Sequence, residues 1–213
     1  MFRFLHQSIR RCAEKALDLG GQVQHLEIAK PATPAEMARL ERRLGRKVPP
    51  QLASLLRTFS KKVLFIWQWD VPAEARKKLM NMDLLWGEVS WDIQDIRVID
   101  PRDYWWAEEI VEGLAPGEWL GKILLHTAPD GDFLALGTEG RIREKPVYLA
   151  HDGTDPRDLV LHGDLLRFFR EWSRIGFLMI NDFWGWRKRT RKDEFDFAKY
   201  AALRDFLSRN GAP

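Results

Sequence analysis

The chain has 213 residues, of which 45% are hydrophobic and 12% aromatic, so it can bury one substantial core but is too short for two ordinary domains and a linker. No stretch reaches the roughly 18 apolar residues of a membrane span, and arginines interrupt the N-terminus where a secretory signal needs an apolar run. The single cysteine, Cys12, excludes an internal disulfide. We therefore expect one cytoplasmic domain with appendages.

The net charge of +3 is unevenly distributed. Residues 1–62 carry 13 Lys and Arg against 5 Asp and Glu, and residues 166–213 carry 11 against 6. Residues 63–165 carry 10 basic and 20 acidic side chains, which gives the middle of the chain a charge of −10. An acidic middle repels phosphate, so the basic ends alone do not indicate a nucleic-acid-binding protein.

The first predicted element is an amphipathic helix that ends at Gly20. Its apolar positions share one face at helical spacing: Phe2, Leu5, Ile9, Ala13, Ala16 and Leu19. The basic polar face would suit a membrane surface, but Glu14 and Asp18 weaken that alternative. We expect the helix to dock on the body of the protein, followed by a short connector over residues 22–30.

A helical hairpin is predicted between Thr33 and Ser60. Thr33 can cap the first helix, Pro34 suits the first helical position, and Glu36 completes a capping box. Gly45 is placed to end this helix in a left-handed turn. Helical spacing predicts the buried positions as Met37, Leu40, Leu44, Leu52, Leu55, Leu56 and Phe59.

Two strands are predicted in the tryptophan-rich part of the chain. Residues 63–69 form a β-rich run that is typical of a buried strand, and residues 84–91 form a second. Residues 73–80 between them predict a helical turn. Residues 92–100 predict a short helix or a turn, and residues 104–114 predict a surface helix or a long insertion with an acidic face.

Three short strands follow, joined by turn-type residues: Lys122–Thr127, Asp132–Leu136 and Pro146–Ala150. This spacing favours an antiparallel meander. Asp164 then caps a helix with one apolar face, and Gly176 closes it. Beyond Phe177 the sequence predicts a basic run and a final amphipathic helix.

Several segments, in this order, resemble the SUKH superfamily, which includes the Smi/Knr cell-wall regulators of fungi and many bacterial immunity proteins. They are the L-E-x-x-L-G motif ending at Gly45, the proline corner Val48–Pro50, DFLAL at 132–136, PVYLAHDG at 146–153 and DLLRFFREW at 164–172. The tryptophan-rich block from Trp67 to Trp106 and the tail after Gly176 depart from the family pattern.

The predicted fold class is α+β, in agreement with what the resemblance implies. A helical hairpin and a later helix pack on one mostly antiparallel sheet, with helical extensions at both ends. We expect residues 1–30 to form the N-terminal helix and connector, and residues 31–175 to form the SUKH-like domain. Residues 176–213 form a basic helical extension packed on that domain.

The sequence offers no positive indication of an enzyme, a metal site or a cofactor. His151 is followed by Asp152 and Gly153, but this group ends a strand and enters a turn, where Asp-Gly is common for backbone reasons. His126 and His162 also sit at strand ends without a metal-binding spacing, so we expect hydrogen-bonded sheet-edge histidines. Motifs for a serine nucleophile, a dithiol pair or a nucleotide loop are absent.

Ten tryptophans are too many to bury in one core, because each covers a large area and needs a partner for its N–H. Those in the middle of the chain are interleaved with acids, and aromatic anchors among acids suit a basic protein partner. The predicted contact residues are Trp86, Glu88, Trp91, Asp92, Asp95, Trp105, Trp106, Glu108 and Glu109. Alternatively, most of the tryptophans fill a shallow core and the acids only keep the surface hydrated.

A basic run near the C-terminus offers a nucleic-acid alternative. Its residues, beside Trp184 and Trp186, are Arg187, Lys188, Arg189, Arg191 and Lys192. They would contact phosphate while the indoles stack on bases. A solvated connector that pairs with Asp193 and Glu194 explains the same residues more simply.

The resemblance implies a non-catalytic protein-binding module. The reading we favour is a bacterial immunity protein that binds a toxin and neutralises it by occluding a basic active site. A regulatory scaffold of the Smi/Knr type is the alternative, since a shared fold does not fix the activity. A hydrolase would instead require His126, His151 or His162 to converge with two carboxylates around a cavity.

Overall fold

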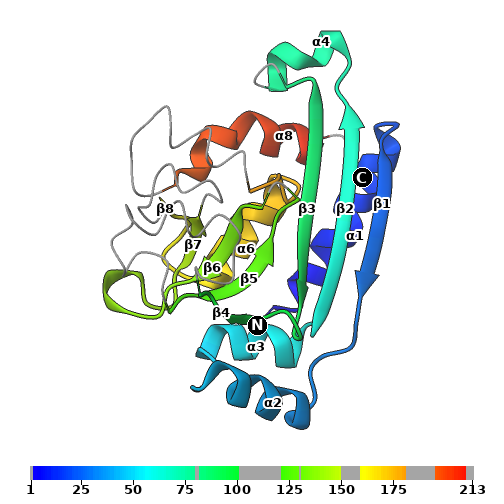
Figure 1. Cartoon of the computed structure of the whole chain (residues 1–213). Helices are drawn as coiled ribbons and strands as arrows, with labels where there is room; N and C mark the ends of the chain where they lie inside the picture. The colour runs from blue at the N-terminus through cyan, green and yellow to red at the C-terminus, as the bar shows by residue number, and fades with distance from the viewer. Residues whose placement is uncertain are drawn as a thin grey trace.

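The computed structural model describes residues 2–79, 82–100, 121–129, 131–149, 159–180 and 195–209. Within these ranges the fold is α+β, as predicted, with helices packed on antiparallel sheets (Figure 1). The α-helices are α1 (Phe4–Asp18), α2 (Pro34–Leu44), α3 (Pro50–Thr58), α4 (Ala73–Arg76), α6 (Leu165–Arg174) and α8 (Ala201–Arg209). The 3-10 helices are η1 (Lys77–Leu79), η3 (Gly140–Ile142) and η4 (Phe197–Tyr200). No helix of these ranges is long and apolar enough to cross a membrane.

The strands form two sheets rather than the single sheet that we expected. The first sheet has the order β1 (Gln22–Ile28), β2 (Lys62–Asp70), β3 (Leu84–Asp92). The second has the order β4 (Arg97–Val98), β5 (Ile123–Thr127), β6 (Phe133–Leu136), β7 (Pro146–Leu149), β8 (Leu159–Val160). All pairs are antiparallel, and β5 to β7 form the predicted meander. β3 and β5 lie side by side at the boundary between the sheets.

Strand β1 occupies the segment that was expected to be a connector. It pairs with β2 from Gln22 opposite Gln68 to Ile28 opposite Val63. Most of its side chains are exposed, because an edge strand has few neighbours to cover it. The alternation of this segment is interrupted by a register shift between Val23 and His25, so the sequence indicates a connector rather than a strand.

The helical hairpin forms as predicted. Thr33 and Glu36 complete the capping box, in which the carboxylate of Glu36 accepts from the Thr33 N–H at 2.8 Å. Gly45 ends α2 in a left-handed conformation with φ of 64°. Leu40 of α2 and Leu52 of α3 are fully buried between the helices and the sheets. The local capping signals in the sequence are therefore sufficient to place this hairpin.

One continuous hydrophobic cluster connects the helices at both ends of the chain with the sheets. α1 packs against α6, β1 and β2, and α8 packs against α6 and η1. The ring of Trp69 on β2 stacks on Phe206 of α8, with 5.6 Å between centroids. A smaller cluster around Phe133 and Val147 lies on the other face of the second sheet. Both basic ends of the sequence therefore pack on one core.

Four of the tryptophans belong to this core: Trp67, Trp69, Trp91 and Trp172. The indole N–H of Trp67 donates to the carbonyl of Gly176 at 2.7 Å, and that of Trp91 donates to Ser60 at 3.1 Å. The expectation that Trp91 lies on an exposed contact face is therefore wrong. It points to the inner side of β3, where its ring lies 5.6 Å from that of Phe169.

Candidate functional site

Strands β2 and β3 alternate between buried side chains on the helix side of the first sheet and more accessible ones on the opposite side. We call the following side chains on that opposite side the outer face: Lys62, Leu64, Ile66, Gln68, Asp70, Leu84, Trp86, Glu88, Ser90 and Asp92. Figure 1 views the sheet from this side, with α1 behind the strands. No helix of the described ranges covers the outer face.

The outer face is apolar at the middle of β2, where Leu64 and Ile66 lie opposite Ser90 and Glu88 of β3. Leu64 and Ile66 of β2 are half-buried, and Trp86 of β3 is half-buried opposite Gln68. Leu84 at the start of β3 is 41% exposed. The indole N–H of Trp86 is buried and has no hydrogen-bond partner among the described residues.

Acidic groups predominate around this apolar middle. The outer face carries three carboxylates against the single amine of Lys62, which pairs at 2.9 Å with Glu27 on β1. This pairing raises the pKa of Lys62 through a hydrogen bond to Glu27. Asp92 is half-buried and accepts from the N–H of Gln94 at 2.9 Å, and Asp95 is exposed in the same turn. Arg97 and Lys62 line the same cleft as Asp92 and Asp95, so this end of the outer face carries both signs of charge.

Arg43 of α2 holds the turn that carries Asp95. Its guanidinium donates to the carbonyl of Ile96 at 3.1 Å from Nε and 2.9 Å from Nη2, and it also donates to Ile93. Arg43 remains exposed to solvent while it makes these bonds. The hairpin therefore anchors the end of β3, and with it the position of the exposed carboxylate.

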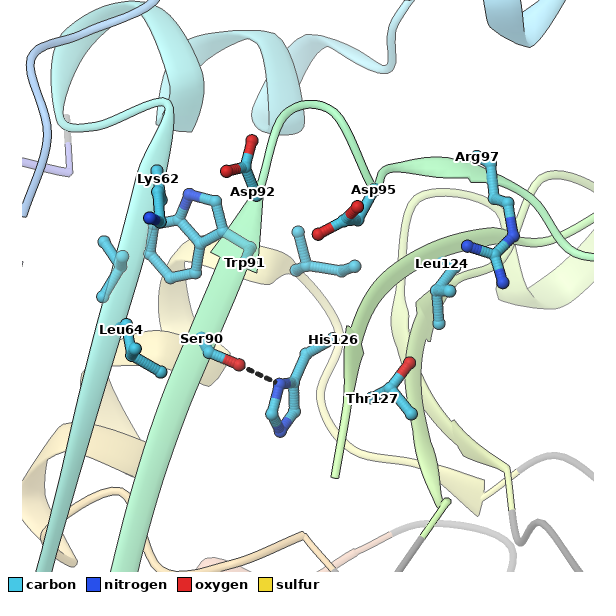
Figure 2. Close-up of a pocket in the computed structure, with 12 residues that line it drawn as sticks. Lys62, Leu64, Ser90, Trp91, Asp92, Asp95, Arg97, Leu124, His126 and Thr127 are labelled. Atoms are coloured by element: carbon cyan, nitrogen blue, oxygen red, sulfur yellow. Dashed lines mark hydrogen bonds between the residues drawn. The ribbon is translucent and has the colours of Figure 1, made fainter. Parts of the chain in front are cut away.

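A cleft of about 460 Å³ lies where the outer face meets the second sheet (Figure 2). Its lining combines apolar, polar and charged side chains: Lys62, Val63, Leu64, Ser90, Trp91, Asp92, Asp95, Arg97, Leu124, Leu125, His126 and Thr127. Figure 2 shows Ser90 and His126 facing one another across the gap between β3 and β5. The cleft is therefore continuous with the acidic end of the outer face.

Ser90, His126 and Glu88 form a polar cluster at the bottom of this boundary. The Ser90 hydroxyl and His126 Nδ1 are 2.7 Å apart, and His126 Nε2 is 3.9 Å from Glu88 Oε1. Burial lowers the pKa of His126 from its ordinary 6.5 to about 4, against the opposing effect of its bond to Ser90. The ring is therefore neutral at pH 7, as a hydrogen-bonded histidine joining two strands.

This cluster is poorly suited to nucleophilic catalysis. Activation of Ser90 would require His126 to take up a proton, and its buried environment disfavours the charged ring. His162 lies at the start of α6, where its Nδ1 accepts from the Asp164 N–H at 3.4 Å, and burial lowers its pKa too. Within the described ranges no group of three His, Cys, Asp or Glu is placed to hold a metal. His151 lies outside those ranges.

The predicted contact residues fall into three groups. Trp86 and Asp92 lie on the outer face six residues apart along β3, and Asp92 and Asp95 line the cleft. Glu88 shares that side of β3 but is only 5% exposed, so the expectation that it is available to a partner is wrong. Trp91 is in the core. The remaining predicted contact residues and the basic run lie outside the described ranges: Trp105, Trp106, Glu108, Glu109, Arg187, Lys188, Arg189, Arg191 and Lys192.

The two apolar side chains that β2 presents on the outer face were not predicted from the sequence. Leu64 and Ile66 belong to the run VLFIWQW, which reads as buried throughout because nearly every position is apolar or aromatic. Only the strict alternation of a strand separates them from Phe65 and Trp67 on the buried side. Applying that alternation to the run would have found them.

Comparison of the chain with protein-family models, with curated proteins and with solved structures finds no match. What can be stated directly is the class: an α+β protein whose first sheet presents an apolar and acidic outer face beside a cleft. The function proposed for this protein depends on the geometry of the outer face and the cleft.

Proposed function

We propose that the protein is a non-catalytic protein-binding module, and that the outer face with its cleft is the contact surface. The observation that carries this proposal is the set of apolar side chains on the outer face, Leu64, Ile66 and Trp86, without a covering helix among the described residues. An apolar centre with a tryptophan and a charged rim is the usual arrangement of a protein interface. The cleft beside it would receive a protruding side chain of the partner.

The excess of carboxylates over amines on the outer face favours a basic partner. Asp92 and Asp95 lie at the end of β3, whereas Lys62 is already paired with Glu27. Carboxylates at the rim of an interface mainly speed association and select partners, and their effect falls with ionic strength. A basic enzyme that acts on an anionic substrate has the matching potential.

The resemblance of several segments to the SUKH superfamily supports the more specific role of a bacterial immunity protein. In this role the outer face binds a toxin and blocks access to its active site. No catalytic group is needed, in keeping with a buried, neutral His126. A regulatory scaffold of the Smi/Knr type would use the same kind of surface without inhibiting its partner.

The test uses the polypeptide encoded next to this protein as the candidate partner. Binding is measured by calorimetry at low and high salt, and protection is measured as growth of cells that express both chains. We expect Trp86→Ala to weaken binding roughly 30-fold, or about 2 kcal/mol, because it removes the aromatic anchor. The double variant Asp92→Lys with Asp95→Lys should slow association about tenfold at low salt.

The control is Glu14→Lys, which makes the charge change of one of these two substitutions on the exposed side of α1, behind the sheet. It should bind like the unmodified protein. Equal losses in Glu14→Lys and in the double aspartate variant would place the contact elsewhere. Tight binding without protection of growth, and without inhibition of the partner, would favour the regulatory scaffold over the immunity protein.

A further inference from the structure

A second cleft, of about 230 Å³, lies where the two basic ends of the chain meet. Three elements form it: one face of α1, the C-terminal end of α6 and one face of α8. Its lining is Ser8, Arg11, Cys12, Lys15, Ser173, Arg174, Gly176, Arg204, Leu207 and Ser208. The α1 residues are spaced by three and four positions, so they share one side of that helix. The proposed contact face lies on the opposite side of the first sheet.

Four cations and no carboxylate belong to this lining among the described residues. Arg174 pairs with Glu171 at 2.7 Å, and Arg204 lies 3.8 Å from Asp205. Each guanidinium has five N–H donors, so one carboxylate does not exhaust it. Arg11 forms no ion pair within the described ranges. The cleft therefore retains donors with positive charge.

The one backbone carbonyl described at the bottom of the cleft, that of Gly176, is already hydrogen-bonded. The carbonyl of Gly176 already accepts from the Trp67 indole at 2.7 Å and from the Cys12 thiol at 3.6 Å. Burial raises the pKa of the Cys12 thiol, which therefore stays protonated and uncharged at neutral pH. Leu207 completes an apolar bottom next to Gly176.

Lys15 adds a buried cation to one wall. Its residue is only 6% exposed, and its Nζ lies 5.9 Å from the centroid of the Phe206 ring. Desolvation lowers the pKa of Lys15, with Asp18 acting in the opposite direction. A bound anion would offset this desolvation.

From this geometry we propose that the basic cleft binds a small organic phosphate. The phosphate lies at the rim against Arg11, Arg174 and Arg204, because guanidinium groups match phosphate oxygens in pairs. A small apolar group of the ligand points toward Leu207. The hydroxyl of Ser8 supplies a further donor, whereas that of Ser173 already donates to the carbonyl of Arg170 at 2.9 Å. This site is independent of the proposed protein-binding function.

The test is calorimetric titration of the full chain with phenyl phosphate, inorganic phosphate and phenol. We expect phenyl phosphate to bind more tightly than inorganic phosphate, because only the ester fills the apolar bottom, and phenol not to bind measurably. The double variant Arg11→Gln with Arg174→Gln should weaken binding of phenyl phosphate at least tenfold. Arg10→Gln, an exposed arginine outside the cleft, is the matched control and should leave affinity unchanged.

Two results would overturn the proposal. One is equal weakening by Arg10→Gln and by a single Arg11→Gln change, which would indicate diffuse attraction to a basic surface. The other is tight, strongly salt-dependent binding of a single-stranded DNA oligonucleotide without binding of phenyl phosphate, which would assign the cations to a nucleic-acid backbone. Thermal unfolding of each variant, measured without ligand, confirms that a lost signal is not a loss of fold.

Discussion

His126 joins the two sheets through a neutral ring, and this sets a condition on the pH at which the junction is stable. Its Nδ1 meets the Ser90 hydroxyl, and its other nitrogen faces Glu88. Protonation of the ring would place a charge in a buried site, where desolvation is costly. The junction therefore depends on the uncharged form of one side chain.

We predict that the free energy of unfolding falls by about 3 kcal/mol as the pH drops from 6.5 to 4, owing to His126 alone. In that window the unfolded chain binds a proton near the ordinary pKa of 6.5, whereas the folded chain, with a pKa of about 4, does not. His126→Gln should remove this contribution. Urea unfolding between pH 4 and pH 8 measures it, and an unchanged pH dependence in the variant would contradict the prediction.

Gly87 is a second single position on which the packing depends. A Cβ added there would lie 1.9 Å from Trp67 Nε1 and 2.2 Å from the carbonyl of Gly176. We predict that Gly87→Ala destabilises the protein by at least about 2 kcal/mol, because neither neighbour can move without breaking their shared hydrogen bond. Gly163→Ala is the control, since its Cβ would meet nothing within 4 Å. Urea denaturation compares the two variants.

At the scale of single elements, the hairpin of α2 and α3 positions one end of the proposed contact surface. Arg43 of α2 holds the turn after β3, so a change at the start of α2 also affects the position of that turn. The capping box at Thr33 and Glu36 fixes this start. Hydrogen bonds from Lys61 and Thr33 hold the pKa of Glu36 at about 2, so the carboxylate accepts these bonds throughout the neutral range.

We predict that Thr33→Ala lowers the free energy of unfolding by about 1 kcal/mol, as loss of a helix cap usually does. Thermal or urea denaturation at pH 7 measures the change. Thr33→Ser retains a hydroxyl at the same position and should restore most of the stability. A Thr33→Ser variant as unstable as Thr33→Ala would show that the methyl group, rather than the cap, is responsible.

How far the sequence predicts each element depends on how local its signals are. The capped helices at Thr33 and Asp164 were predicted because their caps lie within three residues of the helix start. β1 was missed because its alternation is short and is interrupted by a register shift between Val23 and His25. The contact between Ser90 and His126 joins positions 36 apart across two sheets. No local pattern could have predicted that pair.

At the scale of the whole molecule, the fold brings together charged residues that are far apart in the sequence. The N-terminal and C-terminal helices meet beside α6, so two separate basic segments form one basic cleft. The acidic middle supplies β3 and the turn with Asp92 and Asp95, on the other side of the first sheet. The charge of each segment could be counted from the sequence. The placement of basic and acidic residues on opposite sides of the first sheet could not, because it depends on how distant helices pack.

The segment that follows α6 also forms backbone hydrogen bonds with β3 at the edge of the first sheet. The N–H of Glu88 donates to the carbonyl of Phe177 at 2.7 Å, and the N–H of Met179 donates to Trp86 at 3.1 Å. These bonds occupy backbone groups of β3 that would otherwise be open to strands of other molecules. Truncating the chain before Phe177 would expose these backbone groups of β3 to pairing with strands of other molecules. The chain after α6 therefore blocks intermolecular strand pairing at β3, and its helix α8 lines the basic cleft.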